Sequence, residues 1–329
     1  MYDVYTIGSA TQDAFFEGLE FDYHPDDPHM ETRKGLCLPL GTKMRASHVT
    51  FTTGGGGTNT AVTFARQGLK TGVITRVGED VSGREVKENL AKEGVDTSLF
   101  QGDLLLPTSY SVILMAEKAE RTILVYKGAG ENLSSQEVPW SAIETGWFYL
   151  DSIGGNEEIL KAVINLKNTK GVKLMWNPGT NDLARGIDWL KPYLASFNII
   201  IANKDELCSL LSISYEDEKG IMDAFDSLVP SIAIMTEGPE GVVVSDGKRR
   251  YTAGIFPEEV LMDRTGAGDA FGSGFLVGYL KAGIKEGIRM GSANGTSVLE
   301  HIGAKEGILR SDQVNEDRWQ NLSINEENL

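Results

Sequence analysis

The sequence predicts an α/β fold built on a mostly parallel central sheet. From residue 147 onward, short apolar segments typical of buried strands alternate with segments of helical periodicity, which is the pattern of consecutive βαβ units. A glycine-broken turn at residues 263–268 runs directly into an apolar helix that ends at Gly283. The length of 329 residues permits a substantial core in one domain or two. We therefore expect helices on both faces of the sheet.

Composition favours a small-molecule partner over nucleic acid or membrane. The chain has 47 acidic and 31 basic residues, and its formal charge of −16 repels nucleic acid and anionic membrane surfaces. Cys37 and Cys208 are too few for a disulfide framework and indicate a reducing compartment. No apolar run approaches the roughly 18 residues needed to span a membrane, and the N-terminal sequence lacks the basic start of a signal peptide. We expect a cytoplasmic protein.

The first part of the chain combines a buried strand with segments of strand and loop character. Residues 4–7 read as a strand, and the turn that follows places Asp13 beyond its carboxyl end, where open α/β sheets bind ligands. An Asp in a loop is equally well explained as a turn former. Two stretches, residues 14–53 and 103–127, alternate as strands and loops do, the second around a hairpin-like turn at residues 117–121.

Four glycines at residues 54–57 lead directly into a helical pattern. A flexible linker explains a glycine run in isolation. A linker does not normally enter a helix, however, and Thr58 or Asn59 is a suitable N-terminal cap for one.

The segment after residue 263 predicts an anion site. Gly266, Ala267 and Gly268 can present backbone N–H groups around a helix N-terminus, where the helix dipole favours a negative charge such as a phosphoryl group. Asp269 lies in the first turn, where a carboxylate also stabilises any helix. Beside a bound phosphate, the same carboxylate is a candidate general base.

Three further motifs lie in the second half of the chain. Asn203 and Glu206 have the spacing of a helix capping box. Residues 231–247 read as two strands joined by a glycine-proline turn. Asp151 ends an apolar strand, where an Asp is explained by a turn as readily as by substrate contact.

In these motifs the sequence resembles the ribokinase-like (PfkB-type) family of carbohydrate and nucleoside kinases. In chain order, the resemblance is carried by Asp13, the glycine run, Asn-x-x-Glu, Thr-x-Gly-x-x-Gly and DRTGAGD followed by AFGSGF, which together span nearly the whole chain. It implies one three-layer kinase domain, residues 1–329, with a β-sheet lid formed by two insertions at about 14–53 and 103–127. No GxxxxGK[ST] sequence occurs, so a P-loop is not the expected phosphate site.

The resemblance also assigns catalytic and substrate-binding roles. It implies that Asp269 deprotonates the substrate hydroxyl while the amides of Gly266, Ala267 and Gly268 hold the γ-phosphate. The implied substrate contacts are Asp13, Gly54, Gly55 and Asn59.

ATP and Mg²⁺ are the cofactors that the resemblance implies. Glu206 would hold a water of the Mg²⁺ shell, and Asp263 would either cap its turn or contribute to a monovalent-cation site for K⁺. The implied nucleotide contacts are Asn203, Glu206, Thr236, Gly238, Gly241 and Asn294, the last beside the adenine base.

The predicted reaction is ATP-dependent phosphorylation of a hydroxymethyl group on a sugar or sugar-like substrate. Nucleosides of the adenosine or inosine type are the main alternative, and ketoses and 2-keto-3-deoxy sugar acids remain open. A phosphorylated sugar is disfavoured because no Lys and Arg cluster lies near the substrate motifs. A nucleotide-binding sensor without turnover is the alternative from another class, against which Asp269 argues. Unprotected lid strands would favour a homodimer through the lid.

Overall fold

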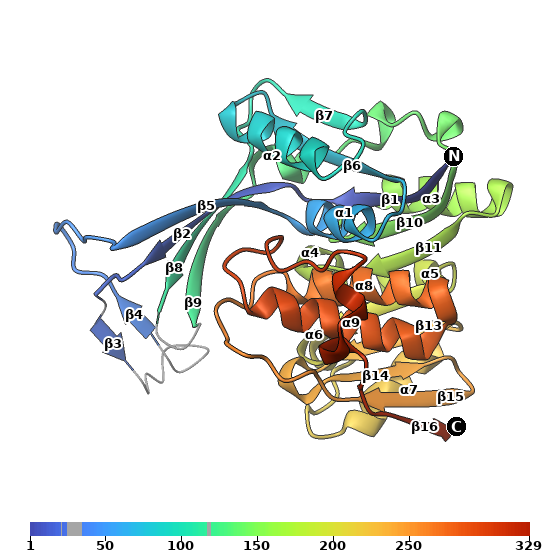
Figure 1. Cartoon of the computed structure of the whole chain (residues 1–329). Coiled ribbons are helices and arrows are strands. Elements are labelled where there is room, and N and C mark those ends of the chain that lie inside the picture. The colour runs from blue at the N-terminus through green and yellow to red at the C-terminus, as the bar shows by residue number, and fades with distance from the viewer. Residues whose placement is uncertain (21, 25–34, 117–119) are drawn as a thin grey trace.

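The computed structural model describes residues 1–20, 22–24, 35–116 and 120–329. Within these residues, ten strands form one central sheet in the order β16-β15-β14-β13-β12-β11-β10-β1-β6-β7 (Figure 1). The strands of this sheet are β1 (Tyr2–Gly8), β6 (Thr71–Gly78), β7 (Phe100–Asp103), β10 (Thr145–Asp151), β11 (Lys173–Asn177), β12 (Ile199–Asn203), β13 (Ile232–Thr236), β14 (Val242–Ser245), β15 (Arg249–Ala253) and β16 (Ile324–Asn328).

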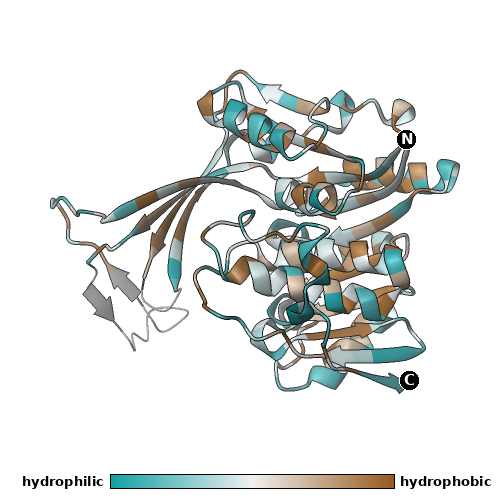
Figure 2. Ribbon diagram, viewed as in Figure 1, coloured by the Kyte–Doolittle hydropathy of each residue, from teal (hydrophilic) through white to brown (hydrophobic). Residues whose placement is uncertain are grey.

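The sheet is parallel from β7 to β13 and antiparallel from β13 to β16. Strand β10 shows why its sequence reads as a continuous apolar run. Trp147 and Tyr149 belong to the core on one face of the sheet, whereas Phe148 and Leu150 belong to the core on the other. Figure 2 shows hydrophobic segments, in brown, within the body of the molecule. A parallel strand covered on both faces buries every side chain, so apolar residues do not alternate with polar ones.

Helices cover both faces and complete the three predicted layers. On one face, the helices α1, α2, α8 and α9 contribute the buried residues, such as Phe64 and Phe275; on the other, residues such as Leu160 and Phe225 come from helices between α3 and α7. The helices are α1 (Gly56–Arg66), α2 (Val81–Lys92), α3 (Glu157–Lys170), α4 (Thr180–Leu183), α5 (Ile187–Leu194), α6 (Lys204–Leu211), α7 (Glu218–Leu228), α8 (Ala267–Ala282) and α9 (Ile284–Leu299).

A second, four-stranded sheet in the order β5-β2-β8-β9 projects from the body of the molecule (Figure 1). Its strands come from the two stretches that were expected to hold strands and loops, although β2 begins three residues earlier. They are β2 (Thr11–Glu17), β5 (His48–Gly54), β8 (Ser109–Met115) and β9 (Arg121–Tyr126). The short strands β3 (Asp22–His24) and β4 (Gly35–Cys37) pair with each other. The predicted turn at residues 117–121 lies largely outside the described residues.

Two local predictions in the N-terminal part are wrong. Asp13 does not lie in a turn, because β2 has already begun at Thr11 and pairs with both β5 and β8. Helix α1 begins at Gly56 with Gly55 as its cap, so Thr58 and Asn59 lie inside the first turn. Gly55 has a φ of 92°, a conformation that favours glycine and that a Thr or Asn cap would not adopt easily.

The residues from about 311 onward are polar and acidic, which predicts a surface helix or a frayed tail, and the structure contradicts this prediction. Residues 324–328 form β16 and pair with β15 as the edge strand of the central sheet. Trp319 is buried against Phe256, with ring centroids 5.3 Å apart. Glu326 is paired with Arg249 at 2.8 Å and with Lys285 at 2.7 Å. Most residues of β16 are polar and lie exposed at the edge of the sheet. Its sequence therefore lacks the apolar periodicity that predicts a strand.

Candidate active site

The site is built at the carboxyl ends of β1 and β10, where the order of the sheet changes direction. From β1 the chain adds β6 and β7 on one side, and from β10 it adds β11, β12 and β13 on the other. Gly8 at the end of β1 pairs with Asp151 at the end of β10, and Asp151 pairs with Asn177 of β11. Such a switch point leaves a crevice beyond the strand ends, which is where open α/β sheets bind ligands.

The glycine run passes through this crevice in close contact with two buried carboxyl groups. A Cβ atom on Gly54 would collide with the carboxylate of Asp13, and one on Gly56 would collide with the carboxylate of Asp151. Both carboxyl groups are buried, with Asp13 at 5% exposure and Asp151 at 6%. The run is therefore a packing requirement of the site and does not serve as a flexible linker.

Asn59 connects helix α1 to helix α8 inside the crevice. Its side-chain Nδ2 donates a hydrogen bond of 2.7 Å to Oδ2 of Asp269. Asn59 is itself buried, whereas Asp269 is only partly covered. This contact joins a residue predicted to bind substrate to the residue predicted to act as the base, although 210 positions separate them in the sequence.

The N-terminus of α8 has the open geometry expected of an anion site. Gly266 caps the helix with a φ of 79°, and a Cβ atom on it would collide with Ala304. Beside Gly268 the space is open, because a Cβ atom there would have no neighbouring heavy atom within 4 Å. The first N–H groups of a helix have no acceptors within it, so those around Ala267 and Gly268 are free to bind an anion.

Burial raises the pKa values of the carboxyl groups in the crevice. Burial raises the pKa of Asp269, although the hydrogen bonds to Asn59 and Asp151 and the charge of Lys305 act to lower it. Burial also raises the pKa of Asp151 well above its usual value, reinforced by the neighbouring Asp269 carboxylate. The crevice therefore opposes ionisation of Asp151 more strongly than ionisation of Asp269.

The carboxyl group of Asp13 is under similar influences. Burial raises its pKa, while a hydrogen bond from Ser111 and the charge of Lys305 act in the opposite direction. Asp13 lies on the same row of the second sheet as Thr52 and Ser111, which pair with it from β5 and β8. The second sheet therefore contributes a polar group directly to the crevice.

Sequence reasoning missed Lys305 and undervalued Asp151. Lys305 lies in the loop after α9, and a lysine in a glycine-rich loop gives no signal beyond that of a solvated side chain. The structure buries it in the crevice. Asp151 was considered both as a turn residue at a strand end and as a substrate contact. The feature that marks it as a residue of this site is its pairing with Gly8, which depends on tertiary structure.

The residues predicted to contact nucleotide lie further along the same edge of the sheet. Asn203 and Thr236 are paired at the ends of β12 and β13. The predicted capping box is confirmed, since Glu206 N donates to Asn203 Oδ1 at 2.8 Å and Asn203 N donates to Glu206 Oε2 at 2.9 Å. Gly238 and Gly241 lie in the turn between β13 and β14, both at positive φ.

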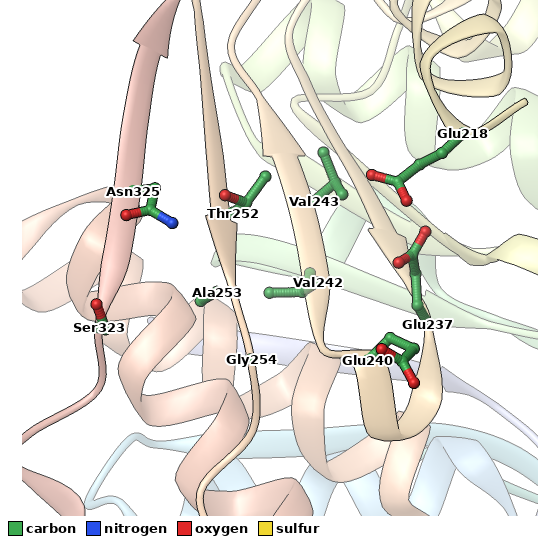
Figure 3. Close-up of a pocket in the computed structure, with 10 residues that line it drawn as sticks. All are labelled: Glu218, Glu237, Glu240, Val242, Val243, Thr252, Ala253, Gly254, Ser323 and Asn325. Atoms are coloured by element: carbon green, nitrogen blue, oxygen red, sulfur yellow. The ribbon is translucent and has the colours of Figure 1, made fainter.

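A pocket of about 370 Å³ lies beside this turn, along β14, β15 and β16 (Figure 3). None of the predicted catalytic residues lines it. Its carboxylates would repel phosphate, and Lys204 neutralises only part of this charge, pairing with Glu237 at 3.2 Å and Glu218 at 3.5 Å. The lining residues are Glu218, Glu237, Glu240, Val242, Val243, Thr252, Ala253, Gly254, Ser323 and Asn325.

Asn294 does not have the environment predicted for a contact with adenine. It is 3% exposed, and its Nδ2 donates to Ala270 O at 2.8 Å and to Thr63 Oγ1 at 3.2 Å. Its Oδ1 accepts a hydrogen bond of 2.9 Å from Leu309 N. The side chain is thus used to connect α9 to α1, α8 and the loop after α9.

Asp263 is fully buried and holds the turn before α8. Its Oδ1 accepts hydrogen bonds from Thr265 N at 3.0 Å and Thr265 Oγ1 at 2.8 Å, and its Oδ2 accepts one from Gly303 N at 3.2 Å. Arg121 of β9 forms an ion pair with it at 3.7 Å. These contacts agree with the predicted capping of the turn, which was one of the two roles considered.

Two absences can be stated for the described part of the chain. No helix there is both long and apolar enough to cross a membrane. No group of three or more His, Cys, Asp or Glu side chains there is arranged to hold a metal ion.

The known proteins to which this chain is similar are carbohydrate and nucleoside kinases. The family model described as pfkB family carbohydrate kinase matches residues 30–310. A ribokinase of Haemophilus influenzae is 31% identical over 233 residues, covering 68% of this chain and 72% of the relative. A nucleoside kinase of Methanothermobacter thermautotrophicus is 26% identical over 265 residues, covering 78% of each chain.

Solved structures agree in fold. A nucleoside kinase of Methanocaldococcus jannaschii, described as an archaeal member of the ribokinase family, matches with a TM-score of 0.78 and 21% identity over 97% of this chain and 98% of that one. A ribokinase of Arabidopsis thaliana, solved with ribose and ATP, matches with a TM-score of 0.77 and 21% identity over 97% of this chain and 99% of that one.

Proposed function

The chain belongs to the PfkB family of carbohydrate kinases, and we propose that it transfers the γ-phosphoryl group of ATP to a hydroxymethyl group of a neutral, hydroxyl-rich substrate. The observation that carries this proposal is the position of Asp269. Its carboxylate is partly accessible, is oriented by Asn59 at 2.7 Å, and lies in the first turn of α8. The proposed base and the proposed anion site are therefore adjacent in the first turn of one helix.

Asp269 is the proposed general base. The substrate oxygen attacks the γ-phosphorus, the bond from phosphorus to the ADP oxygen breaks, and the hydroxyl proton passes to the Asp269 carboxylate. Burial raises the pKa of Asp269 toward the operating pH, which improves a carboxylate as a base. The hydrogen bond from Asn59 fixes which oxygen faces the substrate.

The amides of Gly266, Ala267 and Gly268 are proposed to bind the transferred phosphoryl group. Their position at the N-terminus of the 16-residue helix α8 supports this role, because the helix dipole adds to their individual hydrogen bonds. No side chain or neighbouring segment blocks the space beside Gly268, since a Cβ atom there would have no neighbouring heavy atom within 4 Å.

The nucleotide is proposed to lie across the carboxyl ends of the parallel strands, toward Asn203, Thr236, Gly238 and Gly241. Strands β12 and β13 are two and three strands away from β10. At about 4.8 Å per strand this corresponds to roughly 10 to 15 Å, which a nucleoside triphosphate can span.

The residues present fit a Mg²⁺ ion brought by the nucleotide. One carboxylate oxygen of Glu206 accepts the Asn203 N–H, which leaves the other for a water of the ion's shell. Bound there, Mg²⁺ would neutralise phosphate charge. Asp263 does not fit a K⁺ ion equally well, because both of its oxygens accept hydrogen bonds and Arg121 already supplies a positive charge. We derive no step from a monovalent cation.

The charge of the crevice favours a neutral sugar as the substrate. The carboxyl groups of Asp13 and Asp269 share the crevice with one lysine, Lys305, whose charge offsets only part of theirs. Carboxyl groups of this kind accept and donate hydrogen bonds to hydroxyl groups, but they repel the carboxylate of a sugar acid or the phosphate of a sugar phosphate. This argument disfavours 2-keto-3-deoxy sugar acids, which the sequence left open.

A nucleoside remains the second candidate. Its support is the similarity to a nucleoside kinase across 78% of this chain. The ribose of a nucleoside offers the same primary hydroxyl group to Asp269. A nucleoside would in addition require room for a base between the glycine run and the second sheet.

The second sheet is proposed to act as a lid over the crevice. Strand β2 carries Asp13, and β5 continues directly into the glycine run at Gly54. Any movement of the sheet therefore moves substrate contacts at the same time. Closure would exclude water and limit hydrolysis of ATP.

ADP release, measured across neutral sugars, nucleosides, sugar acids and sugar phosphates, tests the proposal. We expect turnover with a neutral sugar and a loss of about 10²- to 10⁴-fold in kcat for Asp269→Asn. Turnover confined to nucleosides would replace the sugar by the second candidate. ATP binding without any turnover above that of Asp269→Asn would favour a nucleotide sensor.

A further inference from the structure

Lys305 is a buried cation for which the proposed reaction has so far given no role. It is 5% exposed, and its Nζ donates hydrogen bonds to Thr53 O at 2.7 Å and to Thr53 Oγ1 at 3.0 Å. Lysine is rarely buried unless it is paired. Thr53 lies at the end of β5 and directly precedes Gly54, so this lysine holds the end of that strand where the glycine run begins.

The loop that carries Lys305 is fixed, so the lysine cannot easily turn toward solvent. Arg66 Nη1 donates to Lys305 O at 2.8 Å and to Ile308 O at 2.7 Å. Gln67 Nε2 donates to Leu309 O at 2.8 Å. Both donors lie at the C-terminal end of α1, so helix α1 positions Asn59 at one end and the Lys305 loop at the other.

Charged groups from four elements surround the ammonium group. Burial lowers the pKa of Lys305 to about 7, while Asp13 of β2 and Asp269 of α8 act to raise it. Arg66 of α1 acts to lower it, and Glu93, which follows α2, acts to raise it. The interaction is mutual, because Lys305 lowers the pKa values of both Asp13 and Asp269.

We propose that Lys305 is a positioning residue for phosphoryl transfer, which ties β5 to the substrate crevice and keeps the carboxylates of Asp13 and Asp269 ionised. The proposal rests on the proposed function for the meaning of Asp269 as a base. It does not make Lys305 a catalytic residue, since its hydrogen bonds go to Thr53 and its effect on the base is electrostatic. The charge matters most below the pKa of Lys305, where its ammonium group is protonated.

Lys305→Gln is the variant that tests the charge. Glutamine keeps an N–H donor for Thr53 O but has no charge, so the pKa of Asp269 should rise by about one unit, within the range usual for the loss of a nearby opposite charge. The acid limb of the kcat profile should move to higher pH by the same amount, with the rate at high pH changed much less. Lys305→Arg should keep the acid limb of the wild type.

Carboxyl titration by NMR of protein labelled with ¹³Cγ-aspartate gives a readout that does not depend on turnover. Asp13→Asn and Asp269→Asn assign the two signals. Lys281→Met is the matched control, because Lys281 donates to Gln67 at 3.3 Å and neither Asp13 nor Asp269 acts on its pKa. A higher carboxyl pKa in Lys305→Gln, with no change in Lys281→Met, supports the proposal.

Unchanged carboxyl pKa values in Lys305→Gln would overturn the proposal, as would a drop in kcat that is equal at every pH. If Lys305→Gln does not fold, the comparison of Lys305→Arg and Lys305→Met by the same titration decides. If the carboxyl pKa values move but no substrate is turned over, the electrostatic role stands and the proposed function fails.

Discussion

The surroundings of Asp151 oppose ionisation of its carboxyl group. It is buried at the end of β10, and burial together with the neighbouring Asp269 raises its pKa well above the usual value. A carboxyl group whose pKa is higher in the folded than in the unfolded state binds more protons when folded. Between those two pKa values the free energy of unfolding therefore falls as the pH rises.

Asp151→Asn should consequently stabilise the protein at neutral pH. The amide keeps a donor toward Asp269 and removes the cost of an ionisable group in this position, which is about 1.4 kcal/mol for each pKa unit of the shift. Thermal unfolding between pH 4 and pH 8 should show a gain at pH 8 that disappears toward pH 4. A variant less stable than the wild type at pH 8 would contradict this account.

Asp80 provides a control of opposite sign. It caps α2, and although burial acts to raise its pKa, hydrogen bonds from Thr108 and Gly83 hold that pKa below the usual value. Its stabilising effect is present at neutral pH and is lost as the pH falls through the folded-state pKa. Asp80→Asn should therefore destabilise the protein at pH 8, with a difference that shrinks in acid.

At the scale of elements, atoms of neighbouring elements leave no room for a side chain at two glycines inside α8. A Cβ atom on Gly272 would collide with the hydroxyl group of Tyr149 from β10, and one on Gly278 would collide with Glu286 O of α9. Glycine costs about 1 kcal/mol relative to alanine in a helix. At these positions the close approach of the sheet and of α9 offsets that cost.

Gly272→Ala should lower stability by about 1 to 3 kcal/mol, the usual range for overpacking, and Tyr149→Phe in the same chain should restore most of it. The phenylalanine removes the colliding oxygen, which has no hydrogen-bond partner among the described residues. Urea denaturation of the single and double variants measures both effects. Gly268→Ala is the control within the same helix, since its Cβ would meet no atom within 4 Å. Equal losses in the single and double variants would rule out the collision as the cause.

At the scale of the whole molecule, one face of the second sheet carries exposed apolar side chains on its two edge strands, although Ala14 of the inner strand β2 is only 1% exposed. The pairing register places Phe51, Ala14, Val112 and Leu124 in one row across the sheet, on the face opposite to Asp13. Phe51 is 60% exposed and Leu124 is 56% exposed. A large exposed apolar surface of this kind is typical of a protein interface, and the edge strands β5 and β9 are both unpaired on one side among the described residues.

We predict that two copies of the chain associate through this face. Sedimentation at micromolar concentration should show a dimer for the wild type and a monomer for the double variant Phe51→Glu, Leu124→Glu. Leu104→Glu is the control, because Leu104 is 88% exposed but lies after β7 on the body of the protein. A wild-type monomer under these conditions would reject the prediction.

Whether a feature of this protein could be predicted from its sequence depends on how far apart in the chain the interacting residues lie. The capping box of Asn203 and Glu206 is confirmed because its partners are three residues apart. The cap of α1 was wrong because the φ of Gly55 is set by the chain that surrounds it. The role of Asn294 could not be foreseen, since its partners Thr63 and Leu309 come from other parts of the chain.

The sequence by itself determined the α/β class, the alternation of strands and helices and the family, and it predicted an anion site at the start of α8, because each motif involved consists of residues close together in the chain. Only the tertiary structure decided which charges share the crevice. Asp13, Asp151, Asp269 and Lys305 come from four separate segments, and their burial together sets the pKa of each. Electrostatic interaction in a buried site depends on distance in space and on exclusion of water, neither of which is written in local sequence.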